Sequence, residues 1–373
     1  MKRMHRVLVT AATALAVVAV PSAALASAEQ TDRPDRGGLQ KGLDDITANG
    51  ALGALIEVQR DGHVWRGVSG VAELGTTREV PAQGRFRAGS ITKTFVATVV
   101  LQLVDEGWLH LDDKVEKWLP GVVPAGDRIT VRQLLNHTSG VPDYRRTLPM
   151  PPTPEFEADR FRTWSAMELI QRAVTQPATS EPGGEYAYSN TGYLLLGEIV
   201  HKVTGRSYAR EIERRIIEPL WLQGTSLPGT SSRIRGPHPK GYLPVRQGNG
   251  TRLVDFTEMN PSLMGAGGEM ISTTADLNRF MAALVGGRLL PSHLLDEMKT
   301  AGVEGGRYGL GLRWQDTTCG IPVYGNDGDA LAYQAWSFST QDRRRQVTIA
   351  LTPDFRGDPD DAVEALLDKA ICG

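Results

Sequence analysis

The sequence predicts a mixed α/β (α+β) fold in which an antiparallel sheet of about five strands is flanked by helices and interrupted by a mostly helical lobe. Short strand-like runs stand near both ends of the chain, at 51–59 and 63–72 and again at 309–314, 321–324, 331–340 and 346–351. Runs of this length, separated by short turns, are typical of antiparallel strands. Helical patterns at 39–48 and 360–371 flank them, and the middle of the chain is richer in helices and long loops. We therefore expect an α/β lobe from 29–105 and 265–373, with a helical lobe at 106–264.

Residues 1–28 have the organisation of a secretory signal peptide. Lys2, Arg3 and Arg6 precede an apolar run at 7–20, and small residues end the segment at 24–26 or 26–28. The apolar run is too short, and its end too rich in small residues, for a membrane anchor. We therefore expect cleavage after Ala26 or Ala28, release of the protein outside the cell, and no membrane attachment of the mature chain.

The composition argues against nucleic acid and metal partners. The chain has a formal net charge of −2, and removal of the basic leader makes the mature chain more acidic. A mildly acidic protein lacks the positive field that attracts nucleic acid. The seven histidines and two cysteines show no metal-ligand spacing. We therefore expect no metal and no cofactor, and small molecules or peptides as substrates.

The pattern Ser-x-x-Lys begins the most informative helix predicted in the chain. Apolar residues recur at helical spacing after Ser90 and Lys93 as far as Val104, so the helix starts at Ser90. The hydroxyl and the amine then lie one turn apart on the same face. A desolvated lysine with a lowered pKa can take the proton of a serine and make the serine a nucleophile. The same pattern also describes an N-cap serine followed by an exposed lysine.

Two further motifs follow, first Tyr-x-Asn and then a short triad that contains glycine. Tyr188-Ser189-Asn190 lies in a turn-rich segment at 182–193, and 326–328 reads Asn-Asp-Gly after a strand-like run. Together with Ser-x-x-Lys, this order resembles the penicillin-recognising serine hydrolases, which carry the related set S-x-x-K, S-D-N and K-T-G. Tyr-Ser-Asn is similar to the class C β-lactamase and DD-peptidase branch. Segments 134–144 and 267–277 look like framework motifs of that branch, and 308–313 is similar to the secreted D-alanyl-D-alanine carboxypeptidases of actinomycetes.

The resemblance implies a role for each motif residue. Ser90 is expected to be the acylated nucleophile, and Lys93 and Tyr188 share its proton, with either of them as the base. A nearby ammonium group favours a tyrosine pKa well below its usual value. The backbone N–H groups of Ser90 and Asp329 would form the oxyanion hole, and Asn190 would hold the substrate amide. The structural alternative for Tyr188 is a core aromatic residue ahead of the next helix.

The third motif departs from the Lys-Thr-Gly or His-Thr-Gly of the relatives. This chain has Asn326-Asp327-Gly328 followed by Asp329, and we expect all four at the substrate site. Arg313, on the adjoining strand, matches the arginine that anchors the substrate's terminal carboxylate in the secreted carboxypeptidases. Asp327 would stand where that carboxylate is expected, and like charges a few ångströms apart repel by roughly 1 to 4 kcal/mol. Arg313 therefore either anchors a carboxylate or forms a structural ion pair with Asp327 or Asp329.

Cys319 and Cys372 are the two cysteines of the chain. An even number of cysteines in an exported protein favours a disulfide over two free thiols. Cys319 is expected at the start of a strand and Cys372 at the end of the C-terminal helix, so that a bridge would fasten the helix to the sheet. Closing a loop of this length contributes on the order of 4 kcal/mol in the chain-entropy account.

Three classes of function stay open. The first is a secreted, monomeric serine hydrolase of the D-alanyl-D-alanine carboxypeptidase type, which acts on cell-wall D-Ala-D-Ala peptides or analogues and is acylated by β-lactams. The second is an esterase, D-amino-acid amidase or β-lactamase on the same scaffold, in which the altered third motif favours neutral or cationic substrates. The third is a non-catalytic binding protein that kept the cleft, and the intact Ser90, Lys93 and Tyr188 argue against it.

Overall fold

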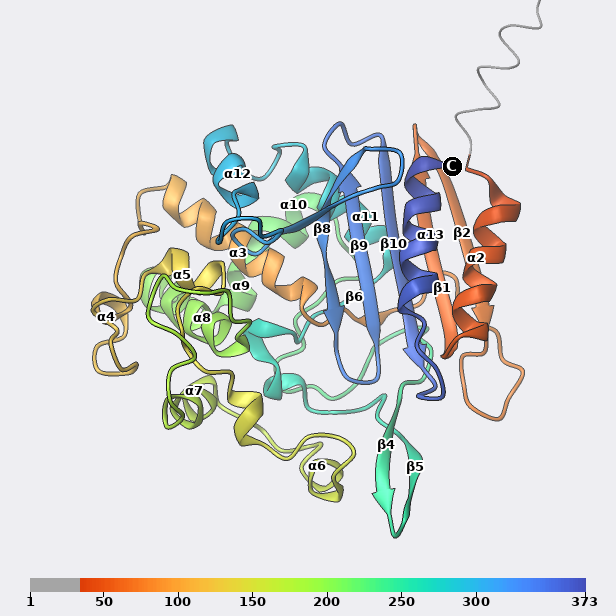
Figure 1. Cartoon of the computed structure of the whole chain (residues 1–373), viewed down its shortest axis with the longest axis horizontal. Helices are drawn as coiled ribbons and strands as arrows, with labels where there is room; N and C mark the ends of the chain where they lie inside the picture. Colours follow the sequence, from red (N-terminus) through yellow and green to blue (C-terminus); the bar gives the residue numbers. More distant parts are fainter. Residues whose placement is uncertain (1–33) are drawn as a thin grey trace, which may run out of the picture. The chain divides into compact units, whose positions relative to one another are not determined.

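A six-stranded antiparallel sheet forms the centre of the computed structural model, which describes residues 34–373; the predicted signal peptide lies outside the described residues. The strand order is β2-β1-β10-β9-β8-β7. β1 pairs with β10 along its whole length, so segments from the two ends of the chain lie side by side (Figure 1). The predicted fold class is confirmed, with six strands where about five were expected. The strands are β1 (Ala51–Arg60), β2 (His63–Gly70), β7 (Arg313–Asp316), β8 (Pro322–Asp329), β9 (Gln334–Thr340) and β10 (Arg345–Pro353).

Two strands begin later than the sequence predicts, and the local backbone explains both differences. The run at 309–314 starts with a turn, because the N–H of Gly309 donates to the carbonyl of Leu312 at 2.8 Å. The run at 331–340 starts with another turn, in which Leu331 has a φ of +68° and the N–H of Ala330 donates to the carbonyl of Tyr333. A strand cannot pass through a left-handed residue, so the ladder starts only after each turn.

Helices cover both faces of the sheet. On one face, Ile56 and Val58 of β1 belong to the same buried cluster as α2 (Arg36–Ala48) and α13 (Asp360–Cys372). Leu55, which points the other way, joins a cluster with α3 (Ile91–Asp105) and α11 (Thr274–Val285). Successive side chains of a strand alternate between faces, so a strand covered on both sides reads as a nearly continuous apolar run. This arrangement places α3, which follows Ser90, in the interior.

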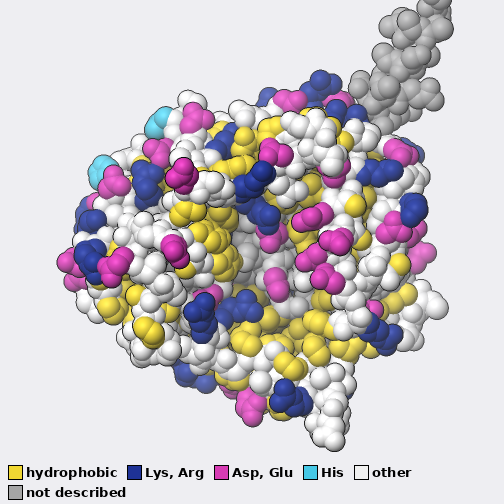
Figure 2. All heavy atoms as spheres, in the orientation of Figure 1, with side chains coloured by type: hydrophobic (Ala, Val, Ile, Leu, Met, Phe, Trp, Pro, Cys, Tyr) yellow, Lys and Arg dark blue, Asp and Glu magenta, His cyan; other side chains and the backbone are white. Residues whose placement is uncertain are grey.

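The middle of the chain is mostly helical, and its division from the α/β lobe at 106 and 264 stays a prediction. One short two-stranded hairpin follows the helices of this segment. Figure 2 shows basic and acidic side chains interspersed over the visible face. Within residues 34–373, no helix has both the length and the apolar character that crossing a bilayer requires. The elements of the middle segment include α4 (Val115–Trp118), α5 (Val131–Leu135), α6 (Pro154–Ala158), α7 (Ala166–Val174), α8 (Asn190–Thr204), α9 (Tyr208–Ile212), α10 (Glu218–Leu220), β4 (Tyr242–Gln247) and β5 (Gly250–Asp255). Outside this segment, α12 (Ser292–Lys299) follows α11.

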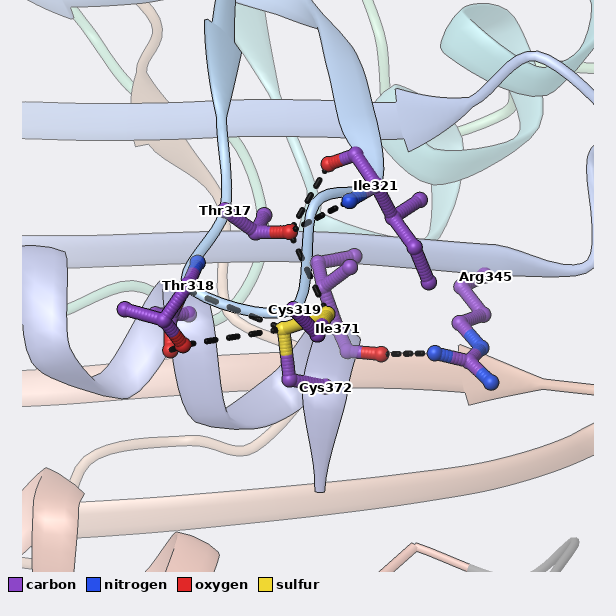
Figure 3. The surroundings of a disulfide bond; sticks show 8 residues. Thr317, Thr318, Cys319, Ile321, Arg345, Ile371 and Cys372 are labelled. Atoms are coloured by element: carbon purple, nitrogen blue, oxygen red, sulfur yellow. Dashed lines mark hydrogen bonds between the residues drawn. A yellow bond between two sulfur atoms is a disulfide. The ribbon is translucent and has the colours of Figure 1, made fainter.

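The structure contains the predicted disulfide. Cys319, in the turn between β7 and β8, is bonded to Cys372 at the end of α13, with their Cα atoms 5.8 Å apart (Figure 3). Beside it, the Arg345 side chain of β10 donates to the carbonyl of Ile371. The C-terminal helix is therefore fastened to the part of the sheet that carries the third motif.

Candidate active site

Ser90 stands directly before α3, at the end of a segment that is held on one side by the sheet pair β3 (Phe86–Arg87) and β6 (Ile271–Ser272). Gly89 has a φ of +53°, a left-handed conformation that favours glycine. Although Ser90 occupies the N-cap position, its side chain makes no capping hydrogen bond. Its hydroxyl instead faces Lys93 and Tyr188, so the simple N-cap alternative is wrong.

Lys93 is fully buried one turn into α3, and the exposed-lysine alternative is therefore also wrong. Its Nζ lies 3.0 Å from Ser90 Oγ, 2.8 Å from Asn190 Oδ1 and 2.5 Å from the carbonyl oxygen of Gly267. Burial lowers the pKa of Lys93 to about 7, although the charge of Asp143 opposes this shift. A buried ammonium is costly without a carboxylate in direct contact, and a neutral amine is correspondingly favoured.

The hydrogen-bond partners of Lys93 suit a neutral amine, which has two hydrogens and one lone pair. Asn190 Nδ2 donates to Asp143 Oδ2 at 2.7 Å, and because a carboxylate only accepts, this contact turns Asn190 Oδ1 toward Lys93. Asn190 Oδ1 and the Gly267 carbonyl then take both hydrogens of the amine. The lone pair is left facing Ser90 Oγ, so the site can place a proton acceptor beside the serine hydroxyl.

Tyr188 approaches Ser90 from the other side, with its hydroxyl 2.5 Å from Ser90 Oγ. The ring is 39% exposed, which rules out the alternative of a core aromatic residue. The surroundings of its hydroxyl nevertheless raise the pKa of Tyr188, mainly through burial, while the hydrogen bond to Ser90 opposes the shift. The expectation that Lys93 lowers this pKa is therefore wrong, because a neutral lysine supplies no field and burial disfavours the phenolate.

His137 packs beneath Tyr188 and is a residue that the motif analysis did not single out, although it lies inside the framework segment 134–144. Its ring is 4.5 Å from the ring of Tyr188, and its Nδ1 accepts from the N–H of Ser189 at 3.2 Å. Burial lowers the pKa of His137 well below its usual range, so the ring is neutral. Among the residues that the structure describes, no group of three or more His, Cys, Asp or Glu side chains could hold a metal ion.

Two glycines let the end of β8 lie directly against the start of α3. A Cβ atom on Gly328 would lie 2.0 Å from the carbonyl oxygen of Ala88 and 2.9 Å from the backbone nitrogen of Ser90. A Cβ atom on Gly89 would lie 2.8 Å from the backbone nitrogen of Asp329. Both side chains must therefore be absent, and the backbone nitrogens of Ser90 and Asp329 come close together. Two convergent N–H donors beside a nucleophile are what an oxyanion hole requires.

Arg313 of β7 forms an ion pair with Asp327 of β8. Of the two partners that the sequence left open, the structure thus selects Asp327 and not Asp329. Asn326 lines the same cavity but is only 4% exposed, and its Nδ2 donates to Thr94 Oγ1 of α3 at 3.0 Å. Strand alternation directs Asn326 toward α3 and the two aspartates toward the cavity.

A cavity of about 440 Å³, called the large cavity below, opens over Ser90. The structure brings the predicted Tyr188, Arg313, Asn326, Asp327 and Asp329 to its wall, while Gly328 packs against the start of α3 instead. Further wall residues were not predicted, although Tyr186 and Tyr308 lie inside motif segments and two arginines directly adjoin such segments. These are Arg145, Tyr186, Arg307 and Tyr308.

Comparison with known proteins agrees with this geometry. A family model described as Beta-lactamase matches residues 37–371. Penicillin-binding protein 4 of Amycolatopsis lactamdurans is 31% identical over 300 residues, which are 74% of this chain and 74% of that protein. The structure of a D-stereospecific amidohydrolase from Streptomyces sp. is 38% identical, with a TM-score of 0.82 over 89% of this chain and 98% of that chain. A D-amino acid amidase from Ochrobactrum anthropi SV3, complexed with D-phenylalanine, is 27% identical, with a TM-score of 0.77 over 89% and 98% of the two chains.

Proposed function

The chain belongs to the Beta-lactamase family and is a serine hydrolase, and on this premise we propose that it hydrolyses amides and esters of D-amino acids through an acyl-enzyme on Ser90. Its preferred leaving groups carry no carboxylate. The D-configuration is supported by the D-stereospecific amidohydrolase and the D-amino acid amidase to which the chain is similar. The signal peptide predicted at 1–28 and the disulfide support an extracellular enzyme.

The ion pair between Arg313 and Asp327 carries the proposal about the leaving group. A carboxypeptidase of this scaffold would need Arg313 to bind the terminal carboxylate of its substrate. Here the guanidinium already has a carboxylate partner, and both residues line the large cavity beside Ser90. A second carboxylate would have to displace or lie beside Asp327, which like charges disfavour. A neutral amide or ester avoids that cost.

Acylation follows from the hydrogen bonds around Ser90. Lys93, as the neutral base, takes the hydroxyl proton while Ser90 Oγ bonds to the substrate carbonyl carbon. The backbone N–H groups of Ser90 and Asp329 stabilise the oxyanion. When the intermediate collapses, the Tyr188 hydroxyl gives its proton to the leaving nitrogen and recovers one from Lys93. A water molecule then attacks the acyl-enzyme with the same groups acting in reverse, which releases the acid and restores Ser90.

Tyr188 is the better acid and Lys93 the better base, because burial raises the pKa of Tyr188 and lowers the pKa of Lys93. Lys93, with a pKa of about 7, is neutral in much of the protein near neutral pH. Tyr188, with a raised pKa, stays protonated and can donate its proton to the leaving group. Two titratable groups whose environments shift their pKa values in opposite directions are suited to acid and base roles. The structure therefore favours one of the two assignments that the sequence left open.

A D-alanyl-D-alanine carboxypeptidase that is acylated by β-lactams is the second candidate. It is supported by the 31% identity to a penicillin-binding protein and by the sequence at 308–313. The two candidates differ in what Arg313 does, because the carboxypeptidase needs the guanidinium for its substrate and the amidase does not.

A substrate panel separates the candidates. D-phenylalaninamide, L-phenylalaninamide, a D-Ala-D-Ala peptide and the C-terminal amide of that peptide are compared by kcat/KM. We expect the D-amide to exceed the L-amide, and the peptide amide to exceed the free peptide by about tenfold, since roughly 1.4 kcal/mol of charge repulsion is avoided. Faster cleavage of the free peptide than of its amide, together with stable labelling by a fluorescent penicillin, would establish the carboxypeptidase instead.

A further inference from the structure

Ser90 lies between two cavities of different character. The large cavity contains Tyr188 and the Arg313–Asp327 pair. A smaller pocket of about 30 Å³, called the small pocket below, also adjoins Ser90 and has mostly apolar walls. Its wall includes Met150, Leu263 and Met264, together with Ser90, Arg145 and Asp329.

The mechanism assigns the two halves of a substrate to these two spaces. The leaving group must lie beside Tyr188, which donates its proton, and therefore occupies the large cavity. The acyl half then lies over the mouth of the small pocket, where Met150, Leu263 and Met264 offer apolar surface to a side chain. The substrate crosses from one space to the other over Ser90.

Three residues line both the large cavity and the small pocket, namely Ser90, Arg145 and Asp329. Arg145 and Asp329 carry opposite charges. Among residues 34–373, neither charged side chain of this pair has an ion-pair partner within 4.0 Å. Asp329 as a residue is exposed, yet partial burial of its carboxylate raises the pKa of Asp329. The positive charge of Arg145 partly offsets this shift. Arg145 and Asp329 therefore interact electrostatically beside Ser90 without forming an ion pair.

Asp329 differs from Asp327, which projects from the same side of β8. Asp327 is neutralised by Arg313. Asp329 Oδ1 accepts from the N–H of Leu331 at 2.5 Å, and its second oxygen has no hydrogen bond from the described residues. An exposed, unpaired carboxylate beside the acyl half of a substrate favours a cation there.

We propose that Asp329 determines specificity by binding the free α-ammonium group of the acyl donor, so that the enzyme prefers unblocked D-amino-acid amides to N-acylated ones. This inference rests on the proposed function. The α-carbon of the acyl donor is bonded to the reacting carbonyl, which the Asp329 N–H helps to hold, so the α-substituents lie next to the Asp329 side chain. The apolar side chain lies against the apolar residues at the mouth of the small pocket. Arg145, which lines both spaces as well, repels an ammonium group and thereby favours its binding at Asp329.

The test compares D-phenylalaninamide with N-acetyl-D-phenylalaninamide in the full-length mature enzyme. The informative quantity is the ratio of their kcat/KM values, free amine over blocked amine. In Asp329→Asn this ratio should fall by about tenfold or more, because a hydrogen bond to a charged group is lost. Asparagine keeps an acceptor for the Leu331 N–H and leaves the backbone donor unchanged, so the fold and the oxyanion hole are preserved.

Asp327→Asn is the matched control, because it removes a carboxylate from the same side of the same strand. Its ratio should stay within about twofold of the wild-type ratio, since Asp327 is already paired and faces the leaving group. A ratio that is unchanged in Asp329→Asn, or that falls equally in both variants, would overturn the proposal.

A binding measurement separates this role from a structural one. In a Ser90→Ala background, Asp329→Asn should weaken binding of D-phenylalanine but not of N-acetyl-D-phenylalanine, as measured by calorimetry. Equal weakening of both would contradict recognition of the ammonium group. Failure of the proposed function looks different, because neither amide would then be hydrolysed by the wild-type enzyme. Hydrolysis of both amides without preference would refute only the role of Asp329.

Discussion

Replacing Asp327 by threonine should convert the site toward substrates that carry a free carboxylate. The change removes one negative charge from the large cavity and releases the Arg313 guanidinium from its ion pair. Threonine is also the middle residue of the Lys-Thr-Gly motif that the third motif of this chain resembles. We expect kcat/KM on a D-Ala-D-Ala peptide to rise, while activity on the peptide's C-terminal amide changes much less.

The magnitude follows from the exposure of the pair. Two unit charges about 4 Å apart interact by about 4 kcal/mol at an effective dielectric constant of 20 and by about 1 kcal/mol in water. The side chains of Arg313 and Asp327 are 37% and 43% exposed, so the solvent screens much of the interaction. About 1.4 kcal/mol of relieved repulsion corresponds to a tenfold gain. Stability should change little, because half-exposed ion pairs contribute about 0.2–1 kcal/mol.

Two controls make the assay specific. Glu297→Gln removes the carboxylate of the Arg132–Glu297 pair, whose side chains are similarly exposed at 33% and 42% but do not line the large cavity. It should leave the preference between peptide and peptide amide unaltered. Adding Arg313→Gln to Asp327→Thr should abolish the gain. If the wild type already cleaves the free peptide efficiently and Asp327→Thr gains nothing, the ion pair does not control the leaving group and the reasoning fails.

Three further predictions concern the base, the acid and the disulfide. The kcat/KM for a neutral ester should rise with pH through an apparent pKa of about 7, because Lys93 acts only when deprotonated; a rise confined to strongly alkaline pH would contradict this. Tyr188→Phe should slow amide hydrolysis by about 100-fold or more and an ester with a good leaving group much less, because only the amine must be protonated to leave; equal losses would argue against an acid role. Cys319→Ser with Cys372→Ser should lower the melting temperature by about 5 °C, from loop entropy divided by the unfolding entropy of a chain of this size; an unchanged value in calorimetry would show that the bridge does not stabilise the fold.

The sequence predicts the architecture where periodicity is strong. The buried strand β1 was recognisable as a short, nearly continuous apolar run, and the helix α3 because apolar residues recur at helical spacing after Ser90. The starts of β7 and β9 were not, since turns that contain the left-handed residues Gly311 and Leu331 precede the two ladders. Local pattern thus finds elements but not the turns that delimit them.

The contacts of the site depend on register and burial, which local pattern does not contain. Arg313 lies opposite Gly325 in the β7–β8 ladder, and because glycine has no side chain, the guanidinium reaches the diagonal neighbour Asp327. Arg145 and Asp329 line the same cavity only because a loop of the middle segment faces the end of β8. The direction of the Tyr188 pKa was mistaken for the same reason, since the extent of burial follows from the packed structure.

Acylation of Ser90 is the central claim, and intact-protein mass spectrometry with peptide mapping tests it most directly. The wild-type enzyme, Ser90→Ala and the control Ser189→Ala are each treated with a fluorophosphonate. Ser189 is a suitable control because it is buried and its hydroxyl has no hydrogen-bond partner among the described residues. The account predicts a single adduct on the peptide that contains Ser90, retained in Ser189→Ala and absent from a folded Ser90→Ala. An adduct of the same yield in Ser90→Ala would contradict it.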